Sequence, residues 1–168
     1  MAAITTFASN QTNMAIQIGQ AAPNFSLFDT EKKEISLDSF KGQNVVLVFF
    51  PLAFTGVCTT ELCSLRDNIN IYGGLNATVL GISVDSLFSL EKFKAEQHIN
   101  FPLLSDFNKD ASIAYDTMYE QFAFGMKGVS KRSAFVIDKE GIVRHAEVLE
   151  DAGKIPDFDA VQAVLKTL

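Results

Sequence analysis

Two cysteines, Cys58 and Cys63, offer the most reactive chemistry in this sequence. They are the only cysteines in the 168 residues and stand five positions apart. In a chain without a signal peptide, such a pair indicates redox or metal chemistry in a reducing compartment. Metal is the weaker interpretation, because His98 and His145 lie far from the pair and complete no zinc-site spacing. We therefore expect thiol redox chemistry, with no metal or other cofactor.

The residues around Cys58 predict a strand, a turn and a helix in succession. Val45 to Phe50 is a run of apolar, mostly β-branched or aromatic residues, which is typical of a strand buried on both faces. Pro51 ends this strand, and Gly56 permits a tight turn. From about Val57 the apolar residues recur at spacings of three and four, which predicts an amphipathic helix.

Cys58 falls in the first turn of this predicted helix. Unpaired backbone N–H groups and the positive end of the helix dipole favour an anion there, and so favour the thiolate, which is the nucleophilic form of cysteine. The competing interpretation is a small buried apolar residue, the common state of a lone cysteine. The position between a buried strand and a helix start favours the nucleophile.

The same residues resemble a family signature. Pro51, Thr55 and Cys58, in the order Pro-x-x-x-Thr-x-x-Cys after an apolar strand, are similar to the active-site motif of the peroxiredoxins. The longer string FPLAFTGVCTTELCSLRD resembles the branch that holds the peroxiredoxin Q (bacterioferritin-comigratory) and AhpE-like enzymes. The resemblance extends more weakly over residues 16–168. It implies a thiol-dependent peroxidase that reduces hydrogen peroxide and organic hydroperoxides.

The resemblance also implies roles for individual residues. Cys58 would attack the peroxide and become a sulfenic acid, with Thr55 positioning the substrate and Pro51 walling the pocket. From the residues alone, Thr55 is a helix N-cap and Pro51 a strand terminator. Arg132 begins a predicted strand, where the family places its active-site arginine. The alternatives are that Arg132 is a solvated charge or that Lys131, which we expect to point away, supplies the cation.

Further pocket residues are expected near Cys58. Glu61 lies three residues later on the same helical side, where related enzymes have a glutamate or glutamine linked to the peroxide pocket. The alternative is an exposed acid that the helix dipole favours. Most of the fifteen phenylalanines belong to the core. Four apolar side chains near the motif or in the later loop are candidate pocket walls: Phe49, Leu52, Phe54 and Phe124.

Cys63 determines the expected subtype. The resemblance implies that Cys-x4-Cys is the spacing of a resolving cysteine, which would form an intramolecular disulfide with Cys58. Five residues of regular helix rise about 7.5 Å, beyond the limit of about 7 Å between bridged Cα atoms. We therefore expect a fully folded reduced state and a locally unfolded oxidised state. The alternative is that Cys63 packs in the core and an external thiol completes a one-cysteine cycle.

Two other function classes stay open. A disulfide oxidoreductase of the thioredoxin type would exchange dithiols without consuming peroxide, although it would use Cys-x-x-Cys instead of the spacing found here. A peroxide sensor or holdase would react slowly and change its binding or assembly on oxidation. In the peroxidase interpretation, a thioredoxin-like donor or another thiol reductant restores the dithiol.

The remaining pattern predicts an α/β fold with a mixed central sheet flanked by helices. The expected order is ββ–β–α–β–α–β–loop–β–β–α, with the first hairpin over residues 19–37 and the last over 132–149. The peroxiredoxin resemblance implies a thioredoxin-like fold with an N-terminal β-hairpin and a peroxiredoxin-type insertion. We expect a flexible tail over residues 1–15 and a single domain over 16–168.

Composition limits the partners. The net charge is −6 and no block of basic residues occurs, so neither nucleic acid nor an anionic membrane is an expected partner. No apolar run approaches the roughly 20 residues of a spanning helix. No export signal is recognisable, so we expect a cytoplasmic protein. The pattern is compatible with a monomer or a homodimer.

Overall fold

The sheet is built around β3 (Asn44–Phe49), whose six residues are all buried. Its side chains alternate between two apolar clusters, with Val46 and Val48 on one face and Val45 and Leu47 on the other. The structure, a computed structural model, describes residues 15–168. The expected tail therefore lies, except for its last position, outside the described residues.

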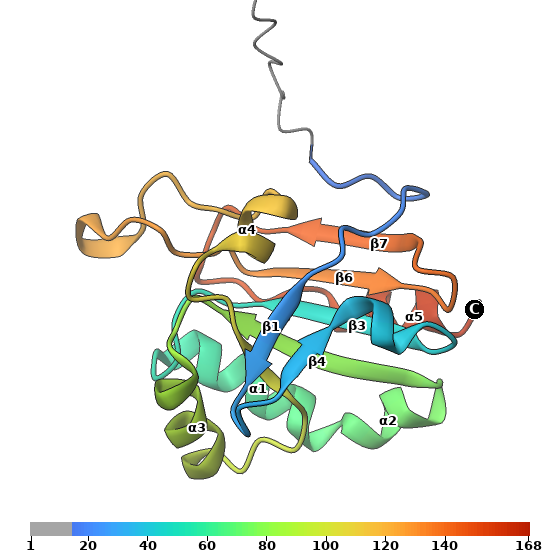
Figure 1. The fold of residues 1–168 in the computed structure, drawn as a ribbon, viewed down its shortest axis with the longest axis horizontal. Coiled ribbons are helices and arrows are strands. Elements are labelled where there is room, and N and C mark those ends of the chain that lie inside the picture. The colour runs from blue at the N-terminus through green and yellow to red at the C-terminus, as the bar shows by residue number, and fades with distance from the viewer. Residues whose placement is uncertain (1–14) are drawn as a thin grey trace, which may run out of the picture.

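Strands of both directions surround β3. The order is β2-β1-β5-β4-β3-β6-β7. On one side, β4 (Ala77–Ser83) and β5 (Leu103–Ser105) run parallel to β3, and the predicted N-terminal hairpin of β1 (Ser26–Asp29) and β2 (Glu34–Ser36) extends the sheet from β5. On the other side, β6 (Ser133–Ile137) and β7 (Val143–Val148) form the predicted antiparallel hairpin. The predicted mixed sheet is confirmed (Figure 1).

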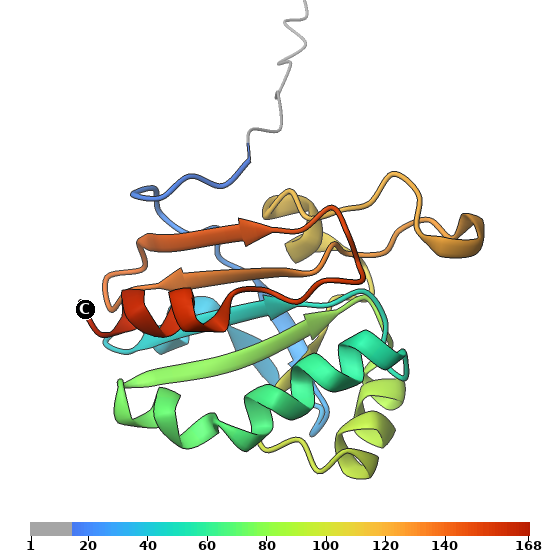
Figure 2. The same ribbon diagram turned by 180° about the vertical axis from the view of Figure 1, so that it is seen from behind.

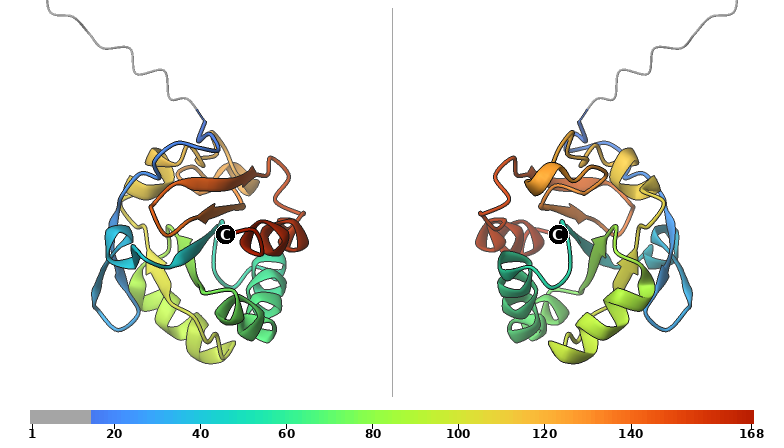
Figure 3. Two further views of the ribbon diagram at one scale, coloured as in Figure 1. Left: turned by 90° about the vertical axis from the view of Figure 1, so that its right-hand side faces the viewer. Right: turned by 90° about the vertical axis from the view of Figure 1, so that its left-hand side faces the viewer.

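Helices cover the two faces unequally. α1 (Gly56–Asp67), α2 (Ile69–Gly74) and α5 (Phe158–Leu165) lie together on one face (Figures 2 and 3), and α3 (Leu87–Glu96) contributes to the same apolar cluster. The opposite face carries α4 (Asp110–Ala114). The chain also forms two short 3-10 turns, η1 (Leu37–Phe40) and η2 (Ala123–Gly125). Within the described residues, no helix has the length and apolar character to cross a membrane.

The helix predicted from about Val57 is followed, after a break, by a second helix. Asn68 separates α1 from α2 with a backbone of φ −108° and ψ 12°. Its side-chain Nδ2 donates to the carbonyl of Ser64 at 2.9 Å, so the amide competes for a carbonyl at the end of α1. Cys58 and Cys63 both lie in α1, before the break.

The segment between α4 and β6 projects from the body of the fold (orange in Figure 1). An isolated bridge pairs Met118 with Ser130 at its base, and η2 lies between them in the chain. Phe124 in η2 is fully exposed. The expectation that Phe124 walls the Cys58 pocket is therefore wrong within this chain, because its ring packs against nothing there.

Candidate active site

The start of α1 places the Cys58 thiol in the interior. Thr55 is the N-cap residue, with extended backbone, and Cys58 lies in the first turn and is fully buried. The Thr55 hydroxyl makes no capping bond and instead donates to the carbonyl of Leu52 at 2.8 Å. No side chain therefore caps the first-turn N–H groups of α1, which leaves them free to interact with an anion at the sulfur.

A strained loop joins β3 to α1. Pro51 is buried at its start, as expected for a residue that ends the strand. We expected Gly56 to supply the tight turn, but Gly56 simply begins α1, and the left-handed residue is Phe54 with φ +65°. Such a backbone is costly for a bulky side chain. The Phe54 ring is half exposed and contacts Phe93 of α3 edge-on, with ring centres 5.2 Å apart.

Arg132 reaches the Cys58 sulfur from the start of β6. Because β6 is antiparallel to β3, the residue before β6 lies at the same sheet edge as the start of α1. Arg132 Nη1 donates to Cys58 Sγ at 3.1 Å and to Glu61 Oε2, and Nη2 donates to the carbonyl of Ala152 at 3.0 Å. The Arg132 and Glu61 side chains are 2% and 0% exposed. The structure thus brings a buried cation between a thiol and a carboxylate.

Lys131, the competing cation, points away from this centre. Its Nζ pairs with Glu150 Oε1 at 2.5 Å and lies 5.9 Å from the centre of the Tyr119 ring. Successive side chains of an extended segment point to opposite sides, so only one of the two neighbouring cations can face inward. That residue is Arg132.

Burial and mutual charge set the protonation of the buried pair. Burial raises the pKa of Glu61 to about 7, although the charge of Arg132 opposes this shift. Burial alone would lower the pKa of Arg132, but the charges of Glu61 and Cys58 outweigh it and raise that pKa. The guanidinium therefore stays positive beside the Cys58 sulfur.

The raised pKa of Glu61 predicts a pH-dependent stability. The folded chain holds this proton up to about pH 7, whereas the unfolded chain releases it near the ordinary value of 4.5. The free energy of unfolding therefore falls as the pH rises through this window. We expect Glu61→Gln to remove this contribution, up to roughly 3 kcal/mol, because the amide does not titrate. Urea unfolding of the parent and of Glu61→Gln at several pH values measures this contribution. Free energies of unfolding that change in parallel with pH in the two proteins would contradict the prediction.

Two buried polar atoms of the centre have no hydrogen-bond partner among the described residues. They are Glu61 Oε1, an acceptor, and Arg132 Nε, a donor. Buried polar atoms are usually paired, so unpaired ones need an explanation. A small ligand that both donates and accepts hydrogen bonds suits this arrangement.

The candidate pocket walls separate into two groups. Phe54 and Leu52 belong to the loop before α1, next to the site. Phe49 faces the opposite side of the sheet, with ring centres 5.4 Å from Tyr115 and 5.9 Å from Phe135. Its assignment as a wall is wrong, because alternate strand residues face α1 and Phe49 is not one of them.

Cys63 occupies the same helix but a different environment. Both cysteines are free thiols, and Cys63 is only partly buried. Its Sγ lies 3.6 Å from Gln97 Oε1, while Arg66 Nη1 donates to the Gln97 carbonyl at 2.6 Å. Cys63 is thus held at the C-terminal end of α3, and helical geometry keeps it from bridging to Cys58.

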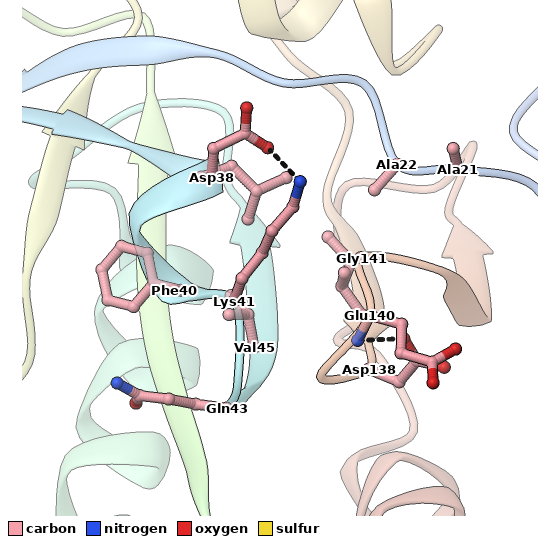
Figure 4. Close-up of a pocket in the computed structure, with 12 residues that line it drawn as sticks. Ala21, Ala22, Asp38, Phe40, Lys41, Gln43, Val45, Asp138, Glu140 and Gly141 are labelled. Carbon is pink, nitrogen blue, oxygen red and sulfur yellow. Dashed lines mark hydrogen bonds and ion pairs between the residues drawn. The ribbon is translucent and has the colours of Figure 1, made fainter.

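Outside this centre the described residues offer little reactive chemistry. A hollow of about 150 Å³ lies at the start of β3, at the opposite end from Cys58 (Figure 4). Its Lys41 and Asp38 pair with each other at 3.7 Å, and neither cysteine lines it. No three His, Cys, Asp or Glu side chains in residues 15–168 are grouped to hold a metal ion.

Sequence analysis missed one contact of the active-site loop. Asp85 Oδ2 accepts the backbone N–H of Ala53 at 2.8 Å. In the sequence, Asp85 and Ser86 follow an apolar run and indicate only the start of a helix. A signal was present, because β3 and β4 are parallel and the residues that follow them must meet at one sheet edge.

The mixed sheet and the buried thiol beside an arginine define a thiol redox protein, and comparison with known proteins agrees with this class. Residues 18–146 match the AhpC/TSA family, and the chain belongs to that family. Alkyl hydroperoxide reductase E of Mycobacterium tuberculosis is 37% identical over 145 residues, covering 84% of this chain and 91% of that protein. A putative peroxiredoxin, ycf42 of Porphyra purpurea, is 38% identical over 143 residues, covering 79% and 69%.

Solved structures agree with the sequence relatives. A mutant of the peroxiredoxin Q of Xylella fastidiosa superposes with a TM-score of 0.82 at 28% identity, covering 92% of this chain and 98% of that one. Peroxidoxin BcpB of Mycobacterium tuberculosis gives a TM-score of 0.79 at 28% identity, covering 91% and 98%. The predicted peroxiredoxin resemblance and thioredoxin-like fold are confirmed.

Proposed function

We propose that this chain is a thiol-dependent peroxidase that reduces hydrogen peroxide and organic hydroperoxides, with Cys58 as the nucleophile. One observation carries the proposal: the buried Cys58 sulfur lies at the start of α1 and 3.1 Å from the Arg132 guanidinium. A cation and a helix start together favour a thiolate.

The first step is attack of the Cys58 thiolate on one peroxide oxygen. The S–O bond forms as the O–O bond breaks, the sulfur is oxidised to sulfenic acid, and the departing oxygen takes a proton to become water or alcohol. Arg132 and the first-turn N–H groups of α1 lie where they would stabilise the departing oxyanion. The unpaired Glu61 Oε1 and Arg132 Nε would bond the peroxide, with the Thr55 hydroxyl on the adjoining turn.

The second step is formation of a disulfide between Cys58 and Cys63. The Cys63 sulfur attacks the sulfenic sulfur, and the hydroxyl leaves as water. This step requires α1 to unwind and Cys63 to leave Gln97. A thioredoxin-like donor then reduces the disulfide to two thiols. The name of one Drosophila melanogaster relative, a thioredoxin-dependent peroxide reductase 35% identical over 164 residues, supports this choice of reductant.

Cys63→Ser separates the two steps. We expect the first peroxide reaction to stay within about twofold of the parent rate, since Cys63 is outside the Arg132 centre, while thioredoxin-coupled turnover falls at least about tenfold. Stopped-flow mixing with peroxide measures the first rate, and a coupled assay measures the second. The neighbouring Ser64→Ala is the control. Unchanged turnover in Cys63→Ser would show that an external thiol, and not Cys63, attacks the Cys58 sulfenic acid.

The proposal is tested by weighing the intact chain after one equivalent of peroxide and a thiol-blocking quench. Loss of two hydrogens, with no free thiol and no dimer mass, supports the two-cysteine cycle. Gain of one oxygen, with Cys63 modified by the thiol-blocking reagent and therefore still a free thiol at the quench, supports a one-cysteine peroxidase. No rapid change would reject the peroxidase and favour a sensor or a disulfide oxidoreductase.

A further inference from the structure

The carboxylate of Asp85 joins the turn after β4 to the loop before α1. Asp85 Oδ2 accepts the Ser83 hydroxyl at 2.7 Å and the Ala53 backbone N–H at 2.8 Å. The Ser105 hydroxyl on β5 donates to the Asp85 carbonyl at 2.7 Å. Asp85 is thus anchored to β4 and β5 while its carboxylate holds a residue that follows β3.

The held residue lies at the most strained point of the active-site loop. Ala53 is buried and immediately precedes Phe54, whose φ is +65°. Such a backbone persists only where the surroundings fix it. The hydrogen bond of Thr55 to Leu52 stays within the loop. In the described part of the chain, the bond from Ala53 to Asp85 is the one that ties this loop to the neighbouring β4–α3 turn.

We propose that Asp85 is a positioning residue for the peroxide reaction. Through Ala53 it fixes Phe54 and Thr55, and with them the start of α1 at which Cys58 meets Arg132. No hydrogen bond joins Asp85 to either of those two residues in the described structure, so it acts through the loop. This inference rests on the proposed function and adds a residue to it.

The same bond opposes the second chemical step. A disulfide between Cys58 and Cys63 requires the start of α1 to unwind, and the Asp85 bond stabilises the loop that leads into it. Loss of this bond is therefore expected to slow the peroxide reaction without slowing disulfide formation. A general loss of folding would slow both steps.

The test compares three variants of the full chain in single-turnover reactions with hydrogen peroxide. Asp85→Ala removes the acceptor, and we expect the peroxide rate to fall about tenfold, the scale of one lost hydrogen bond. Asp85→Asn keeps an acceptor oxygen, and we expect it to stay within about twofold of the parent rate. Ser86→Ala is the matched control, because Ser86 caps α3 by accepting the Ser89 N–H at 3.2 Å and its hydrogen bonds within the described chain stay inside α3. Quenched mass analysis follows disulfide formation in the same samples.

Hydrogen exchange locates the effect in the chain. We expect faster amide exchange in residues 51–58 of Asp85→Ala, with unchanged exchange in residues 87–96. An unchanged peroxide rate in Asp85→Ala, an equal loss in Ser86→Ala, or a loss in Asp85→Asn as large as in Asp85→Ala would each overturn the positioning role. If Asp85→Ala does not fold, Asp85→Asn alone tests the proposal. A fall of its peroxide rate by more than about twofold would then overturn the positioning role. An unreactive parent chain would instead reject the proposed function.

Discussion

Cys58→Ser is expected to abolish peroxide consumption, with a loss of more than about 10³-fold, the scale seen when an enzyme loses its nucleophile. A serine hydroxyl stays protonated at neutral pH even beside Arg132, so no anion is present to attack the O–O bond. Serine is close in size to cysteine and can accept the Arg132 hydrogen bond, so we expect the fold to persist. Stopped-flow mixing with hydrogen peroxide measures the loss, with circular dichroism to verify folding.

The control for this variant is Cys63→Ser, which removes the other thiol of α1. The two together distinguish loss of the nucleophile from loss of any thiol. Fast peroxide consumption by Cys58→Ser would refute the assignment of the nucleophile, and an inactive Cys63→Ser in the single-turnover reaction would show that Cys63 acts earlier than proposed.

Arg132→Ala is expected to lower the peroxide rate by about 10²- to 10³-fold, the scale of a lost donor to a developing oxyanion. The variant removes the cation that contacts Cys58 and leaves Glu61 buried without its partner. Breaking a buried ion pair by removing one member costs about 3–5 kcal/mol of stability. Because Arg132 lowers the pKa of Glu61, its removal raises that pKa further. The loss of stability is therefore smaller near pH 5 than near pH 8.

Lys131→Ala is the matched control for the arginine. The two cations are adjacent in sequence, but Lys131 faces Glu150 at the surface. We expect Lys131→Ala to change stability by less than about 1 kcal/mol and the peroxide rate by less than about twofold. Alkylation of Cys58 by iodoacetamide reports its thiolate content in each variant, and equal rates in Arg132→Ala and the parent would remove the arginine from the mechanism.

The local pattern of the active-site segment was predictable because each of its parts has its own signal. The apolar run before Pro51 predicted a buried strand, and the turn after it predicted a helix that begins near Cys58. The position of Arg132 relative to Cys58 was different. It depends on the antiparallel pairing of β6 with β3, which local pattern does not provide. The resemblance gave only the place of the arginine at the start of its strand.

Several features depended on contacts that no local pattern contains. The burial of Glu61 and its contact with Arg132 join residues 71 positions apart, so an exposed first-turn acid was an equal alternative. Phe49 was misplaced because a shift of one residue along a strand changes the face of the sheet. Nothing local marks Phe54 as left-handed. Phe124 was placed in the pocket although it lies on a segment that projects from the fold.

The burial of Glu61 has a consequence for the acid–base balance of the redox cycle. If α1 unwinds when Cys58 and Cys63 join, the Glu61 carboxyl enters water and its pKa falls from about 7 toward 4.5. Near neutral pH, part of the population then releases one proton with each disulfide formed. By linkage, alkaline conditions favour the oxidised form. A side chain outside the electron transfer thus couples the midpoint potential of the cysteine pair to the surrounding proton concentration.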